Sequence, residues 1–80
     1  MNHFKIVYYA LLRQQRGLAE ERVSSNAQTA RDLYIELKEL HQFQLAESQL
    51  QVAVNAEIVP WQTSLKDGDS ILFIPPVAGG

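Results

Sequence analysis

The clearest periodic pattern in the chain is the segment Asn26–His41, with the sequence NAQTARDLYIELKELH. Four apolar residues recur in it at spacings that place them on one face of a helix: Ala30, Leu33, Leu37 and Leu40. Thr29, with Asp32 three residues later, is typical of a helix N-terminus. A helix with one apolar face has to bury that face, and we expect a β-sheet to cover it.

Strand-like segments lie on both sides of this helix. Residues 4–9 alternate between two faces and are rich in aromatic and β-branched residues, and residues 18–24 form a charged segment that suits an edge strand. Further strands are predicted at 50–54, 57–59 and 71–74, a short helix at 10–16 that ends at Gly17, and a polar loop at 42–49. This order predicts an α+β fold in which one long and one short helix pack on one face of a mixed sheet of about five strands.

Several side chains are assigned by their positions in this pattern. Tyr8 is expected in the core, and Trp61 in a loop that covers part of it. Arg13 and Arg16 are expected on a solvated helix face. The pair Asn55-Ala56 predicts a turn between two strands.

The composition excludes several classes of protein. The chain has 80 residues, 46% of them hydrophobic, so we expect one small domain. It has no cysteine, which excludes disulfides, zinc–thiolate sites and thiolate nucleophiles. The formal net charge is −2 with dispersed basic residues, so we expect no nucleic acid partner. No apolar run approaches the length of a membrane span, so we expect a cytoplasmic protein without a membrane partner. His3 and His41 are far apart in the sequence, so we expect no metal site.

The C-terminal segment 75–80 stands apart from this domain, which we place at residues 1–74. Its two prolines end the last strand and favour an extended path, and its final Gly-Gly pair has no Cβ, so a terminal carboxylate could enter a channel too narrow for side chains. Adenylation by ATP would make that carboxylate reactive, provided that the enzyme excludes water. A frayed end without function is the alternative.

Four motifs together resemble a known family: Thr29-x-x-Asp32-Leu33, Val52-Ala53-Val54-Asn55, Leu65-x-Asp67-Gly68-Asp69, and above all Phe73-Ile74-Pro75-Pro76-Val77-Ala78-Gly79-Gly80. They resemble the small subunits of molybdopterin synthase, which are ubiquitin-like sulfur carriers with a β-grasp fold. The resemblance covers nearly the whole chain, and the double proline before Gly-Gly is its most specific part.

The resemblance implies a chemical role for the last two residues, Gly79 and Gly80. An adenylyltransferase related to ubiquitin-activating enzymes would use ATP to activate Gly80, and a sulfur donor enzyme would convert it to a thiocarboxylate. The large synthase subunit would then bind the tail and transfer the sulfur to cyclic pyranopterin monophosphate, in a heterotetramer of two small and two large chains. In this family the large subunit holds the catalytic side chains. The chain would therefore be a sulfur-donor subunit that is not itself catalytic and binds no cofactor.

A docking surface can be argued from the strands. Lys5 and Ser70 are polar members of two strand faces, which indicates that these faces are not covered by the helices. Apolar residues there would be exposed and would mark a partner site. We expect partner contacts at Tyr9, Ile58, Leu72, Phe73, Ile74, Pro75, Pro76, Val77 and Ala78. The facing of Ile58 is open, and inverted faces are the alternative.

Other functions remain open from the sequence. One is a carrier of the same fold that supplies thiamine or another thiolated product, and another is a protein modifier joined through Gly80 to a lysine. A third is an interaction module of ubiquitin-like fold with an inert tail. An acyl-carrier shuttle is excluded, because no Asp-Ser-Leu stands at a helix start to carry a phosphopantetheine group.

Overall fold

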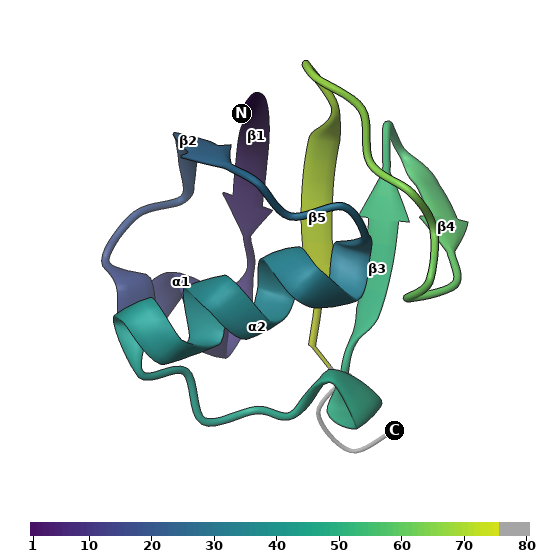
Figure 1. The fold of residues 1–80 in the computed structure, drawn as a ribbon. Helices are drawn as coiled ribbons and strands as arrows, with labels where there is room; N and C mark the ends of the chain where they lie inside the picture. Colours follow the sequence, from purple (N-terminus) through teal and green to yellow (C-terminus); the bar gives the residue numbers. More distant parts are fainter. Residues whose placement is uncertain (76–80) are drawn as a thin grey trace.

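The structure is a computed structural model that describes residues 1–75. Within these residues it contains five strands, two α-helices and one 3₁₀ helix (Figure 1). In chain order they are β1 (Asn2–Tyr8), α1 (Ala10–Arg16), β2 (Glu20–Ser25), α2 (Ala30–His41), η1 (Glu47–Gln49), β3 (Gln51–Val54), β4 (Glu57–Val59) and β5 (Ser70–Ile74). The expected tail lies outside the described residues from position 76 onward, so the division at 74/75 stays a prediction.

The five strands form one mixed sheet in the order β2-β1-β5-β3-β4. The first and last strands in the sequence, β1 and β5, are parallel neighbours in its interior, and all other neighbouring strands are antiparallel. Helix α2 crosses one face of the sheet (Figure 1), and Leu12 of α1 reaches the same core. The predicted α+β architecture with a mixed five-stranded sheet is confirmed.

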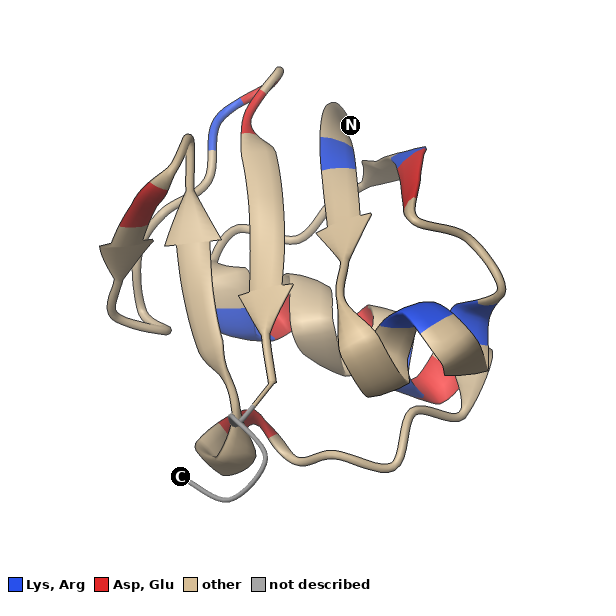
Figure 2. Cartoon of the chain, turned by 180° about the vertical axis from the view of Figure 1, so that it is seen from behind, with Lys and Arg blue, Asp and Glu red and all other residues tan. Residues whose placement is uncertain are grey.

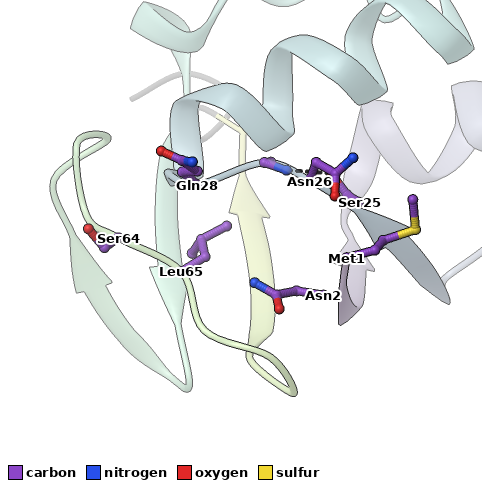
Figure 3. A pocket seen from close by; sticks show the side chains of 8 residues that line it. Met1, Asn2, Ser25, Asn26, Gln28, Ser64 and Leu65 are labelled. Atoms are coloured by element: carbon purple, nitrogen blue, oxygen red, sulfur yellow. Dashed lines mark hydrogen bonds between the residues drawn. The ribbon is translucent and has the colours of Figure 1, made fainter.

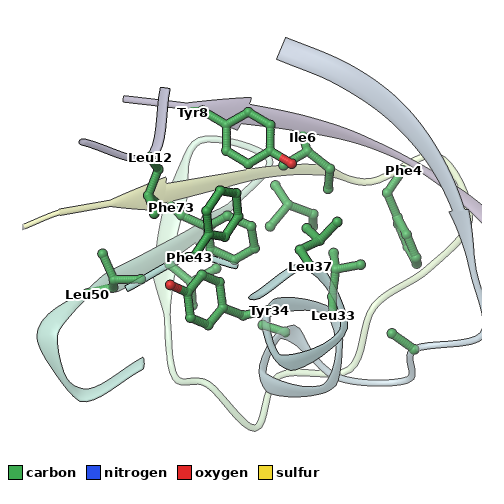
Figure 4. Packing of buried hydrophobic residues seen from close by; sticks show 14 of the residues in the cluster. Phe4, Ile6, Tyr8, Leu12, Leu33, Tyr34, Leu37, Phe43, Leu50 and Phe73 are labelled. Atoms are coloured by element: carbon green, nitrogen blue, oxygen red, sulfur yellow. The ribbon is translucent and has the colours of Figure 1, made fainter. Parts of the chain in front are cut away.

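The core lies between α2 and the covered face of the sheet (Figure 4). Phe4, Ile6 and Tyr8 alternate along β1 and are all buried, because successive residues of a strand point to opposite faces. Ile71 and Phe73 do the same on β5. The buried residues of α2 are Ala30, Leu33, Tyr34 and Leu37.

Helix α2 begins at Ala30, directly after Thr29, so the helix start predicted from Thr29 and Asp32 is confirmed. Thr29 caps the helix, because its side-chain oxygen accepts a hydrogen bond of 3.2 Å from the Asp32 N–H. Thr29 also forms an isolated bridge with Ser64 in the loop before β5. The residues before the helix therefore join the sheet side of the domain instead of extending the helix.

The predicted apolar stripe of α2 is wrong at one residue near the C-terminal end of the helix. Leu40 is 68% exposed, and Tyr34 is the fourth buried residue instead. The reason is the following loop, which is not purely polar. Gln42 adopts a left-handed φ of 60°, and the Phe43 N–H donates to the Lys38 carbonyl at 3.1 Å. This turn brings the Phe43 ring back into the core, so that Phe43 rather than Leu40 closes this end of it.

Candidate functional site

The C-terminal tail begins at the centre of the sheet. The last residue of β5, Ile74, lies opposite Gln51 of β3, and the preceding Phe73 lies beside Tyr8 of β1. Pro75 follows directly, and because proline has no N–H to donate, it cannot continue the pairing as an ordinary residue would. The chain therefore leaves the sheet between β1 and β3.

Figure 2 shows the sheet from the side turned away from α2. The strand register places an apolar row on this face, across four strands. The register pairs Val7 of β1 with Leu72 of β5. Leu72 in turn pairs with Ala53 of β3, and Ala53 with Ile58 of β4. Residues in register project to the same face, so the facing of Ile58 is now determined. We call these four residues the apolar row; Ala53 is itself buried, and Ile58 is 60% exposed.

Four of the residues predicted to contact a partner are accessible at this open face or its edge. Leu72 and Ile58 belong to the apolar row, and Ile74 is the next outward residue along β5. Tyr9 follows β1 directly and is 51% exposed. They form an apolar surface beside Pro75, where the tail begins. We call Pro75 the tail root.

Phe73 is a correction to the predicted contact set. Its side chain is fully buried, because it alternates with Leu72 and Ile74 and points toward α2. Its ring centroid lies 5.0 Å from that of Tyr34 and 6.1 Å from that of Trp61, which stacks on it and covers the core as predicted. The remaining predicted site residues, Pro76, Val77, Ala78, Gly79 and Gly80, lie outside the described residues.

A polar network that the sequence did not predict holds the end of β1 beside Tyr9. The Tyr8 hydroxyl donates to Glu21 Oε2 at 2.6 Å, and the Arg16 guanidinium donates to both carboxylate oxygens of Glu21 at 2.8 and 2.9 Å. His41 Nε2 lies 3.7 Å from Glu21 Oε2. One carboxylate thus joins β1, α1, β2 and α2. The expectation that Arg16 lies on a solvated face is wrong.

The electrostatics of this network indicate a structural role. Hydrogen bonds from Arg16 hold the pKa of Glu21 below its usual value, so the carboxylate is ionised at neutral pH. Burial raises the pKa of Tyr8 and lowers that of His41, so both are neutral there. One carboxylate is therefore balanced by one guanidinium. Among residues 1–75 no buried side-chain polar atom lacks a partner.

A hollow of about 310 Å³ lies at the opposite end of the domain (Figure 3). Its walls come from the start of β1 and from the loops at 26–28 and 64–65. The hydroxyl of Ser25, at its rim, already has two hydrogen-bond partners: it donates to Glu36 at 2.8 Å and accepts from the Ala27 N–H at 2.9 Å. No side chain that lines the hollow carries a charge, and no acid–base pair lies there.

Residues 1–75 contain no cluster that could hold a metal ion and no helix that could cross a membrane. No three His, Asp or Glu side chains gather where they could hold a metal ion. In the same part of the chain, neither helix has the length and apolarity needed to cross a membrane. The apolar open face and the tail root are therefore the candidate functional site.

A mixed sheet in this strand order, crossed by one long helix and ending in a central C-terminal strand, defines a ubiquitin-like β-grasp protein. The sequence pattern of the ThiS family matches residues 6–80, and the chain belongs to this family.

Several proteins that are similar to this chain are named for molybdopterin synthesis. A solved structure from Pyrococcus furiosus, named for subunit 1 of the molybdopterin converting factor, is 32% identical with a TM-score of 0.79, over 96% of this chain and all of that one. A chain in the Helicobacter pylori complex of molybdopterin-converting factor subunits 1 and 2 shares the fold, at 23% identity and a TM-score of 0.68, over 98% of this chain and 99% of that one. The molybdopterin synthase sulfur carrier subunit of Haemophilus influenzae is 44% identical over 36 residues, 45% of this chain and 44% of that protein. The matches span less than half the length of the curated relatives.

Proposed function

We propose that the protein is the sulfur carrier subunit of a molybdopterin synthase and that the Gly80 carboxylate carries the sulfur. The observation that carries this proposal is the position of β5. The same strand bears Leu72 and Ile74 on the open face and leads directly to Pro75. A partner that docks on the open face therefore meets the root of the tail as well. Membership of the ThiS family and the names of the relatives support the same function.

The proposed activation of Gly80 has two steps. An adenylyltransferase of the ubiquitin-activating type joins a carboxylate oxygen of Gly80 to the α-phosphorus of ATP, and pyrophosphate leaves. The terminal sulfur of a persulfide on a donor enzyme then attacks the acyl carbon, and AMP leaves. A thiol cleaves the resulting acyl disulfide, is itself oxidised to a disulfide, and releases the thiocarboxylate. Gly79 and Gly80 have no Cβ, which suits a narrow channel that excludes water from the acyl-adenylate.

Transfer then takes place in the large subunit. There the thiocarboxylate sulfur attacks cyclic pyranopterin monophosphate, and two deliveries build the dithiolene. The side chains of the large subunit provide the catalysis, so this chain donates sulfur and binds no cofactor of its own. The complex contains two small and two large chains. The Helicobacter pylori complex of subunits 1 and 2 is a precedent for the pairing.

Docking uses the apolar open face. Tyr9 and Ile58 are more than half exposed, and exposed apolar side chains that gather in one patch mark an interaction site. They flank Leu72 and Ile74 near the tail root. Burial of this surface against the large subunit would supply affinity while the tail enters the active site.

The test of the chemistry is an intact-mass measurement. The protein is incubated with ATP, an adenylyltransferase of this class and a sulfur donor, and we expect a mass gain that corresponds to one exchange of oxygen for sulfur at the C-terminus. A chain extended beyond Gly80, or with Gly79→Val, should fold normally and show no exchange. Equal thiocarboxylate yield from either variant would contradict the role of the bare Gly-Gly end. Addition of the large subunit with the pyranopterin, or of a thiazole-forming system instead, separates the proposed product from that of a thiamine carrier.

The test of the surface is a calorimetric titration with the large subunit. Ile74→Asp places a charge on the open face and should weaken binding strongly with little loss of stability, because Ile74 is not a core residue. Ile35→Asp is the matched control, since Ile35 is 42% exposed but lies on α2, away from this face. Wild-type affinity in the Ile74 variant would reject the surface.

A further inference from the structure

The end of the open face away from the tail root carries two like charges in register. Lys5 of β1 lies directly opposite Arg22 of β2. Like charges placed opposite one another on a sheet face repel and destabilise it. The sequence has both cations at these positions although the net charge of the chain is −2. The fold alone gives no reason for this pair.

Only one of the two cations has a carboxylate nearby. Lys5 Nζ lies 3.4 Å from Glu20 Oε2, across the same two strands. Arg22 is exposed, and no carboxylate lies within ion-pair distance of its guanidinium among residues 1–75. A guanidinium presents a planar set of donors that matches a carboxylate. Arg22 is therefore the free member of the pair.

A groove of about 350 Å³ runs between these two side chains. The residues that line it include no acidic side chain, and two of them, Ser24 and Ser70, add hydroxyl groups: His3, Phe4, Lys5, Arg22, Val23, Ser24, Gly68 and Ser70. We call Lys5, Arg22, Ser24 and Ser70 the basic notch. In Figure 2 the blue band on β1 lies beside the charged part of β2.

The basic notch continues the proposed docking surface. Lys5 is two residues before Val7 on β1, and Ser70 is two residues before Leu72 on β5, so each pair shares the open face. Two residues along a strand span about 7 Å. A partner that covers the apolar row therefore reaches the notch without a change of face.

We propose that the large subunit places an acidic side chain in the basic notch, where its carboxylate accepts hydrogen bonds from Arg22 and Lys5. This inference rests on the proposed function, because it names a feature of the same partner. The carboxylate would relieve the repulsion between the two cations and fix the rotation of the domain on its partner, which the apolar row alone does not define. Charged residues on an edge strand can instead guard against strand pairing, but that role concerns β2 and does not call for a cation opposite it on β1.

The experiment reverses the charge of Arg22. Arg22→Glu places a carboxylate opposite Lys5, so the variant should be at least as thermally stable as the wild type. Its affinity for the large subunit, measured by calorimetry at low salt, should fall about tenfold or more, the scale of one lost charge-assisted hydrogen bond. Its binding should also depend less on salt. Lys38→Glu, with the same change in net charge on α2, should bind as the wild type does.

The outcomes separate this proposal from the carrier function. Equal affinities for Arg22→Glu and Lys38→Glu would overturn the notch, and self-association of the Arg22 variant would then assign the charge to edge protection. If the wild type gains sulfur at Gly80 but does not bind the large subunit, the notch is overturned while the sulfur chemistry stands. If Arg22→Glu binds weakly but gains sulfur normally, the notch is supported as a docking feature independent of activation.

Discussion

The hydroxyl of Tyr8 provides the most direct test of the network around Glu21. Tyr8→Phe removes one oxygen from a side chain that is otherwise packed in the core, and Glu21 keeps its two bonds from Arg16. The loss is thus a single hydrogen bond to a charged acceptor, which is worth about 1.5–3 kcal/mol. For a domain of this size, 2 kcal/mol corresponds to a fall in Tm of about 8–16 °C.

The assay is urea unfolding followed by circular dichroism at pH 7, with Tyr9→Phe as the matched control. Tyr9 is 51% exposed, and its substitution should change the free energy of unfolding by less than about 0.5 kcal/mol. In a Glu21→Ala background, Tyr8→Phe should no longer destabilise, because the acceptor of its hydroxyl is already gone. The reasoning fails if Tyr8→Phe matches the Tyr9 control, or if its loss is the same with and without Glu21.

Three further predictions concern stability. Ala56 adopts φ 73° in the β3–β4 turn, so Ala56→Gly should raise the free energy of unfolding by about 0.5–1 kcal/mol, seen as a higher urea midpoint. Leu37→Ala should cost about 2–5 kcal/mol and Leu40→Ala less than about 0.5 kcal/mol, because only Leu37 is buried; equal losses would contradict the observed helix face. Burial raises the pKa of Tyr34 to about 12, whereas an unfolded tyrosine ionises near 10. Its contribution to stability is thus fully present below pH 10 and is lost as the pH rises toward 12, and Tyr34→Phe should flatten the fall in the urea midpoint over this range.

Local patterns were sufficient for the strands and the open face. Alternation along β1 and β5 correctly separated buried Ile6 and Ile71 from their outward neighbours, because strand residues alternate with a fixed period of two. Ile58 needed the register, which depends on the partner strand β3 and on the turn between them. Phe73 belongs both to the tail motif and to β5, and its burial follows from the strand alternation, which the motif does not reveal.

The helix stripe and the polar network depended on contacts between distant segments. Tyr34 and Leu40 both fit a helical period, and the choice between them was made by Phe43, which returns to the core only after the left-handed turn at Gln42. The charges of Arg16 and Glu21 looked like surface charges in the sequence. These two residues lie five apart across the turn at Gly17, but the other two partners of Glu21, Tyr8 and His41, come from distant segments, so no local pattern predicts the network.

The central position of β5 has a consequence for synthesis of the protein. Strand β5 fills the gap between β1 and β3, so the sheet cannot close until β5 has left the ribosome. A chain cut short before β5 would lack Ile71 and Phe73 from its core and would be degraded as unfolded protein. Quality control in the cell would thus remove chains that end before β5.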